Sequence, residues 1–165
     1  MRDAFHQELD AIQATLVTMG EMVSVAMSRS SEALLKADVK LAEQVISEDE
    51  KLDTIQHDLE ARAINLMARQ QPVAQDLRIL VTSLRMSADL ERMGDLCHHI
   101  AKLARMRYPE VAVPAELVKT IENMGTTAVK IIEKSTRVVK TQDLQAAIEL
   151  ETDDDEMDKL HRELF

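Results

Sequence analysis

The residues in this sequence that could do chemistry are three pairs of carboxylates, each with its members four residues apart. The pairs are Asp49 with Asp53, Glu91 with Asp95, and Asp154 with Asp158. At 3.6 residues per helical turn, both members of a pair project from one face, with Cβ atoms about 6 Å apart. Like charges this close repel one another, and a cation neutralises them. Oxygen-rich sites suit hard divalent ions and iron.

The apolar residues around the first two pairs are more informative than the spacing. With about 100° of rotation per residue, Asp49 and Asp53 interrupt an apolar sector of their helix. In the next segment an apolar row becomes acidic halfway along, because it continues into Glu91 and Asp95. The apolar part of that row is Leu77, Val81, Leu84 and Ala88.

Histidines close to these pairs could add nitrogen ligands. His98 and His99 lie one turn beyond Asp95, and His161 lies three residues after Asp158. A simpler interpretation is open for each feature. In an acidic chain a carboxylate pair is often a solvated helix face, and adjacent histidines are often a surface or capping pair. Cys97 falls on an apolar seam, so we expect it to be buried packing rather than a nucleophile.

The composition predicts an all-α fold. The 165 residues carry a formal charge of −10, with 45% apolar, 30% charged and only 2% aromatic residues. Few aromatics, three glycines and three prolines argue against a large sheet. The charge argues against nucleic-acid binding, because Lys and Arg hold the phosphate backbone. One cysteine fits a reducing cytoplasm, and without a run of 18 apolar residues we expect no membrane span.

Hydrophobic periodicity predicts five helices. They are expected up to residue 35 and over residues 39–68, 72–107, 116–139 and 144–165. Asp38 and Asp143 are expected to cap the second and fifth helices, and Pro72 is expected in the first turn of the third.

An internal repeat divides the chain. A shift of 105 residues places Met19-Gly20 on Met124-Gly125 and Asp53 on Asp158. The last two helices therefore repeat the first two, and a counterpart of the third helix would end near residue 212. We expect a three-helix bundle over residues 1–107, a linker over 108–114, and over 115–165 the first two helices of a second bundle that is incomplete in this chain.

Two stretches of the sequence resemble the PhoU family of bacterial phosphate-signalling regulators. They are Arg69-Gln70-Gln71-Pro72-Val73-Ala74-Gln75-Asp76-Leu77-Arg78 and Leu90-Glu91-Arg92-Met93-Gly94-Asp95. The two-repeat layout with carboxylate pairs matches as well, so the resemblance covers essentially the whole chain. It implies tandem three-helix bundles, of which the second here lacks its last helix.

The same resemblance implies a function. Metal ions would be held by the three carboxylate pairs, Asp49 with Asp53, Glu91 with Asp95, and Asp154 with Asp158; the family's metals include iron, zinc, magnesium and manganese. PhoU-like proteins repress phosphate-starvation signalling, acting through the phosphate ABC transporter and its sensor histidine kinase. Cytoplasmic localisation, with peripheral membrane association through the transporter, and the absence of catalytic residues would follow.

Two alternatives stay open at this point. One is a di-metal carboxylate enzyme of ferritin-like layout, which would use Glu-x-x-His pairs facing the bundle interior. The chain has no Glu-x-x-His, but contains Asp95-x-x-His98 and Asp158-x-x-His161. The other is a helical adaptor whose acidic pairs are solvated and hold no metal.

We also expect a homodimer. Without a third helix in the second repeat, apolar residues of the last two helices would be uncovered, and such stripes mark association sites. The simplest arrangement exchanges these helices with another copy across a two-fold axis.

Overall fold

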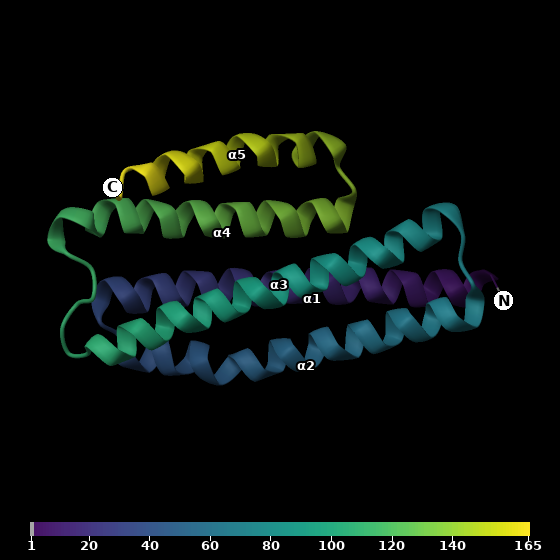
Figure 1. The fold of residues 1–165 in the computed structure, drawn as a ribbon, viewed down its shortest axis with the longest axis horizontal. Helices are drawn as coiled ribbons and strands as arrows, with labels where there is room; N and C mark the ends of the chain where they lie inside the picture. Colours follow the sequence, from purple (N-terminus) through teal and green to yellow (C-terminus); the bar gives the residue numbers. More distant parts are fainter. Residues whose placement is uncertain (1) are drawn as a thin grey trace.

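The computed structural model describes residues 2–165, with side chains from residue 4 onward. The fold is all-α, as predicted, and the described residues contain no strand. Its elements are α1 (Arg2–Lys36), α2 (Val39–Gln70), α3 (Ala74–Arg107), the short 3-10 helix η1 (Ala115–Leu117), α4 (Val118–Thr141) and α5 (Leu144–Arg162). Figure 1 shows α3 crossing α1, with α2 on one side of α1 and α4, followed by α5, on the other.

The helix ends follow local chemistry. Asp38 accepts a hydrogen bond from the amide of Leu41, and Asp143 accepts from the amides of Gln145 and Ala146, so both predicted N-caps are confirmed. The prediction for Pro72 is wrong. Helix α2 runs on to Gln70 and α3 begins only at Ala74, so Pro72 lies in the connection between the two helices.

Helix α1 supplies the centre of the core. Its buried apolar residues recur at alternating spacings of three and four and are Phe5, Leu9, Ile12, Leu16, Met19 and Val23. They pack against Leu59 and Leu66 of α2 and Leu80 of α3. A second cluster near the other end of the bundle includes Cys97, whose pKa burial raises to about 11, so its thiol stays protonated as packing.

By length and composition, α1 could also cross a membrane. The expectation of no membrane span was based on uninterrupted apolar runs. By average hydropathy, however, Ala4–Lys36 passes the test for a spanning helix, because it contains an 18-residue window of mean hydropathy 1.2. Core helices of soluble proteins pass the same test. In this fold α1 contacts α2, α3 and α4, and its apolar residues line the core between them.

Helix α4 lies antiparallel to α1, and the two meet through equivalent residues of the two repeats. A Cβ added at Gly20 would lie 2.1 Å from Thr136 Oγ1, and one at Gly125 would lie 2.7 Å from Ser31 Oγ. The 105-residue shift turns Gly20 into Gly125 and Ser31 into Thr136. The interface is therefore reciprocal, with an approximate two-fold axis inside one chain.

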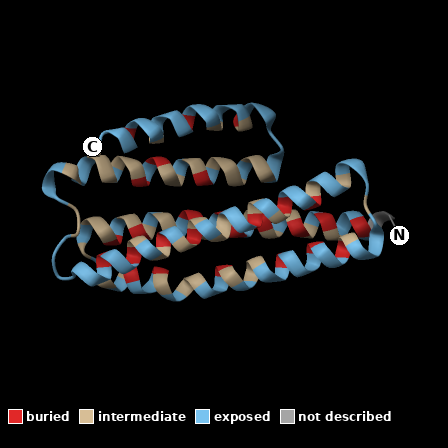
Figure 2. Ribbon diagram, viewed as in Figure 1, coloured by how far each residue is buried: buried red, intermediate tan, exposed pale blue. Residues whose placement is uncertain are grey.

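This packing corrects the expectation that the last two helices leave their own first bundle. Ile132 of α4 is 3% exposed and belongs to the same core as α1. Helix α5, in contrast, contacts only α4 among the described elements. Its residues Leu144 and Ile148 are 80% and 65% exposed, and α5 is mostly pale blue in Figure 2. The homodimer itself stays a prediction.

Candidate metal centre

Three of the four carboxylates predicted on α2 and α3 meet. Oxygen atoms of Asp49 and Asp53 from α2 and of Asp95 from α3 all lie within 4.8 Å of one another, and all three residues are partly buried. Gly94 allows the two helices to approach here, since a Cβ at this position would lie 2.3 Å from Cδ2 of Leu52 on α2. A larger residue would have to displace the end of the buried Leu52 side chain.

Burial and mutual repulsion of the carboxylates dominate the electrostatics of the cluster. Burial, and then the charges of Asp49 and Asp95, raise the pKa of Asp53 above its ordinary value. Burial also raises the pKa of Glu91, and the charges of Asp95, Asp53 and Asp49 add to the effect. The charges of the other three carboxylates therefore act on Glu91, but no Glu91 oxygen belongs to the group of oxygens that lie within 4.8 Å of one another.

The nearest cation does little to offset this charge. Arg92 Nη1 lies 3.6 Å from Asp95 Oδ2, and the arginine side chain is 64% exposed, so water screens the pair. Oδ1 of Asp53 is buried and has no hydrogen-bond partner in the described part of the chain. An orphaned buried carboxylate oxygen costs free energy unless something else satisfies it.

His98 belongs to this cluster, whereas His99 does not. The Nδ1 atom of His98 is hydrogen-bonded to Oδ2 of Asp49, and the two side chains are only 18% and 14% exposed. His98 Nε2 is buried without a partner among the described residues. His99 is exposed. The interpretation of the two histidines as a surface pair is therefore wrong for His98, because α3 turns it toward α2.

The residues present fit a metal ion. Three carboxylates converge, one of their oxygens is buried without a partner among the described residues, and the arginine that pairs with Asp95 is mostly exposed to solvent. Carboxylate oxygens suit magnesium, manganese and iron, and a neighbouring imidazole is also compatible with zinc. The described residues contain no second group of at least three such ligands.

The predicted pair on α5 has different surroundings. Asp154 and Asp158 are exposed, and they belong to no group of three potential metal ligands within the described part of the chain. The adjacent Asp153, which the sequence analysis passed over, is the buried acid and is 6% exposed. Lys134 Nζ lies 2.6 Å from Asp153 Oδ2 and Lys130 Nζ lies 2.9 Å from Asp153 Oδ1. Hydrogen bonds from these two lysines lower the pKa of Asp153, and the contribution of Lys134 is the larger.

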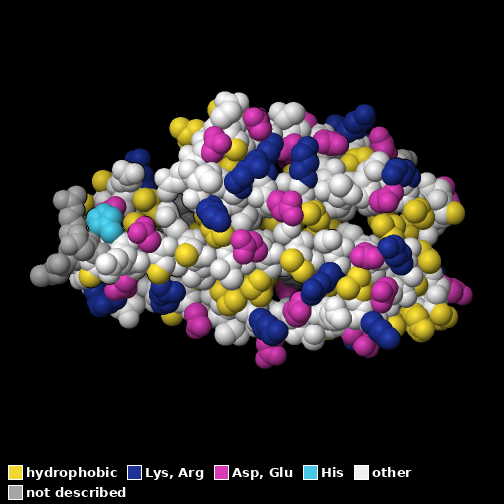
Figure 3. Space-filling view, turned by 180° about the vertical axis from the view of Figure 1, so that it is seen from behind, with side chains coloured by type: hydrophobic (Ala, Val, Ile, Leu, Met, Phe, Trp, Pro, Cys, Tyr) yellow, Lys and Arg dark blue, Asp and Glu magenta, His cyan; other side chains and the backbone are white. Residues whose placement is uncertain are grey.

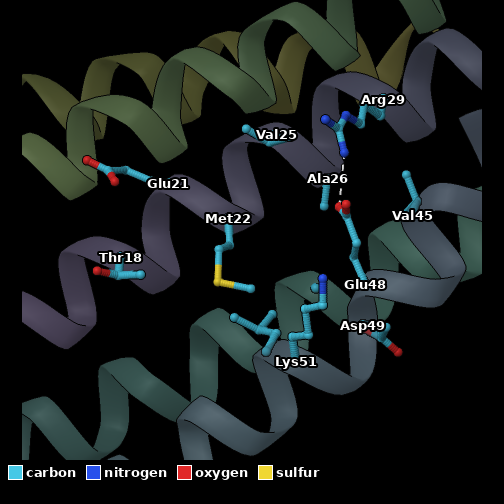
Figure 4. A pocket seen from close by; sticks show the side chains of 12 residues that line it. Thr18, Glu21, Met22, Val25, Ala26, Arg29, Val45, Glu48, Asp49 and Lys51 are labelled. Atoms are coloured by element: carbon cyan, nitrogen blue, oxygen red, sulfur yellow. Dashed lines mark hydrogen bonds and ion pairs between the residues drawn. The ribbon is translucent and has the colours of Figure 1, made fainter.

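The first repeat holds a corresponding ion pair. The 105-residue shift maps Lys134 onto Arg29 and Asp153 onto Glu48, and Arg29 Nη1 lies 2.9 Å from Glu48 Oε2. Comparing the charges of the two aligned repeats would have revealed this pair. Figure 4 shows Glu48 directed at Arg29 across a cleft of about 370 Å³ between α1 and α2, with Asp49 pointing away from that pair.

Comparison with known proteins decides the family. The PhoU domain matches residues 16–104. The chain is 43% identical over 165 residues to "Phosphate-specific transport system accessory protein PhoU homolog 2" of Mycobacterium tuberculosis, covering 100% of this chain and 78% of that relative. This chain belongs to the PhoU family. The PhoU homolog 1 of Mycobacterium leprae is 41% identical and is covered over 74% of its length.

Solved PhoU structures have the same fold. The crystal structure of PhoU from Pseudomonas aeruginosa matches with a TM-score of 0.87 at 24% identity, covering 96% of this chain and 75% of that one. The phosphate transport system regulatory protein PhoU from Streptococcus pneumoniae matches with a TM-score of 0.85 at 25% identity, covering 97% and 74%. The names of these relatives describe accessory and regulatory proteins.

Proposed function

We propose that this PhoU-family protein is located in the cytoplasm, binds a divalent metal ion between α2 and α3, and regulates the uptake of phosphate into the cell. The observation that carries the metal proposal is the meeting of Asp49, Asp53 and Asp95, whose oxygens lie within 4.8 Å of one another. Glu91 lies at the edge of the cluster, where its charge strengthens attraction for a cation. The bound ion would offset the repulsion that raises the pKa of Asp53.

The regulatory part of the proposal rests on the relatives, which are named accessory proteins of the phosphate-specific transport system. Our protein would act negatively through the phosphate ABC transporter and its sensor histidine kinase, without catalysis, and would meet the membrane through the transporter. Acidic and basic side chains are interspersed over the face shown in Figure 3. Such a surface suits contact with a protein partner more than with nucleic acid.

Metal binding can be tested on the full chain with a matched control. We expect titration calorimetry with Mn²⁺ or Zn²⁺ to detect a site that Asp53→Asn weakens at least about tenfold, because a shared ion needs ligands from both helices. Asp158→Asn makes the same change at the equivalent position of the second repeat and should leave this site unchanged. Both substitutions preserve side-chain volume.

Thermal unfolding provides a second measurement. A metal that binds only the native state stabilises it by about 2.7 kcal/mol at a hundred times its dissociation constant. For a chain of this size, that corresponds to a rise in Tm of about 5–11 °C. Monovalent salt of equal ionic strength should have a smaller effect. Equal shifts from both salts, or equal losses in Asp53→Asn and Asp158→Asn, would contradict the metal site and favour a metal-free adaptor.

Regulation needs a cellular measurement. Deleting the gene should switch on phosphate-uptake genes in phosphate-rich medium, and expressing the full chain should repress them again. If the deletion strain responds to phosphate like its parent, the regulatory proposal is wrong, whatever the metal content of the protein.

A further inference from the structure

We propose that His98 is a positioning residue of the metal centre, which holds the carboxylate of Asp49 in the orientation that an ion requires. This inference rests on the proposed metal binding between α2 and α3. The side chain of His98, on α3, is hydrogen-bonded to Asp49, a proposed ligand on α2. His98 would thus act through Asp49 rather than touch the ion.

The position of His98 on α3 makes this contact possible. It follows Asp95 by three residues, so the two side chains lie on neighbouring parts of one helix face. Asp95 contributes an oxygen to the cluster, while His98 reaches Asp49 across the gap between the helices. Both members of the contact are largely buried, which protects the hydrogen bond from competing water.

The chemistry of the two groups fixes the direction of the hydrogen bond. An ionised carboxylate can only accept, so the proton lies on Nδ1 of His98. The bond occupies Oδ2 of Asp49 and leaves Oδ1 available to an ion. It also limits rotation of a carboxylate that Asp53 and Asp95 would otherwise repel. The imidazole therefore keeps Asp49 close to the other two ligands.

A direct ligand role fits the geometry less well. The group of ligand atoms within 4.8 Å of one another contains oxygens of Asp49, Asp53 and Asp95 and no nitrogen of His98. Residues that hydrogen-bond a metal ligand typically change metal affinity by about 10–100-fold when they are replaced. They do so for every ion the site accepts, whereas loss of a nitrogen ligand affects zinc far more than magnesium.

The test compares three variants of the full chain by calorimetric titration with Zn²⁺, Mn²⁺ and Mg²⁺. His98→Ala removes the donor, and we expect all three affinities to fall by similar factors of about 10–100. His98→Asn can place an amide N–H close to the position of Nδ1, so it should recover most of the loss. His99→Ala changes the exposed neighbour and should bind like the wild type. A Tm without metal that is equal in His98→Ala and His98→Asn would separate positioning from general packing.

Several results would overturn the inference. Affinities unchanged in His98→Ala would show that Asp49 needs no support, and His98→Asn as weak as His98→Ala would remove the hydrogen bond as the cause. A loss confined to Zn²⁺ would make His98 a direct ligand. If the wild type binds none of the three ions, the proposed metal function fails and this inference fails with it; the other outcomes leave metal binding intact.

Discussion

The two repeats of this protein carry the same carboxylate spacing at equivalent positions, yet within residues 2–165 only the first repeat forms a cluster. Asp49 and Asp53 on α2 meet Asp95 of α3, whereas Asp154 and Asp158 on α5 are exposed. The ion pair beside them is nevertheless present in both repeats, as Arg29 with Glu48 and as Lys134 with Asp153. The two helical hairpins are thus alike, and the cluster requires an element that lies outside the hairpin.

That element is the third helix. In the first repeat α3 packs along α1 and α2 and brings Asp95, Gly94 and His98 to the face of α2 that carries Asp49. Among the described elements α5 contacts only α4, so the outward pair of the second repeat faces water. Two carboxylates on one helix are half of a metal site, and the second half has to come from another helix.

The largest stability effect is expected where the two repeats meet. In Gly20→Ala the new Cβ would lie 2.1 Å from Oγ1 of Thr136, a β-branched residue whose hydroxyl donates to the Ile132 carbonyl. Overpacking of this kind costs about 1–3 kcal/mol, and the better helix propensity of alanine returns roughly 1 kcal/mol. We expect the free energy of unfolding in urea to fall by up to about 2 kcal/mol.

The equivalent change in the other repeat is the matched control. In Gly125→Ala the nearest atoms are Oγ of Ser31 at 2.7 Å, which can rotate away, and Cβ of Ser31 at 3.0 Å, which cannot. A tight contact with Cβ of Ser31 then remains, and the helix propensity gained should offset more of the clash than in Gly20→Ala, so the loss of stability should be smaller. If both alanines destabilise the protein equally, the reciprocal contacts are equally rigid and the distinction between the two sides of the interface is wrong.

An intermediate effect is expected for Asp153→Asn, which removes the charge that Lys130 and Lys134 hold on α5. The lysines lower the pKa of Asp153 below 3.8, so its contribution to stability is complete above pH 3.8 and is lost as the pH falls through the lowered value. We expect the variant to have a lower Tm than the wild type at pH 7. That difference should shrink in acid; a constant difference from pH 7 to pH 3 would mean that packing, rather than charge, is lost.

The smallest effect has the opposite sign. Burial and neighbouring acids raise the pKa of Asp53 above 3.8, so its charged form destabilises the metal-free native state, increasingly as the pH rises through the interval above 3.8. Asp53→Asn should therefore stabilise the metal-free protein at pH 7, because it removes a charge disfavoured first by burial and then by Asp49; relief of the repulsion from Asp49 alone contributes about 0.2–0.5 kcal/mol. Urea unfolding with chelator present, at pH 7 and again near pH 4, measures this gain. A destabilised variant at pH 7 would show that the cluster is not strained by charge.

Much of the fold could be predicted because helices depend on local chemistry. The spacing of Phe5, Leu9 and Ile12 indicated the buried face of α1, and Asp38 and Asp143 were recognisable as caps. The start of α3 was predicted too early, because a proline is as acceptable just before a helix as in its first turn. The carboxylate pairs identified both halves of the cluster on α2 and α3, since residues four apart share a helix face.

The sequence by itself determined the five helices, the repeat, and which helix faces carry acid. Only the tertiary structure decided which acids meet. His98 and His99 are adjacent and chemically identical, and the rotation of α3 against α2 turns the first toward Asp49 and leaves the second in water. In the same way, the packing of α5 on α4 buries Asp153 against Lys134 and leaves the adjacent Asp154 exposed. Periodicity fixes positions around one helix axis, whereas the contact between two axes depends on how close small residues such as Gly94 and Gly20 let them come.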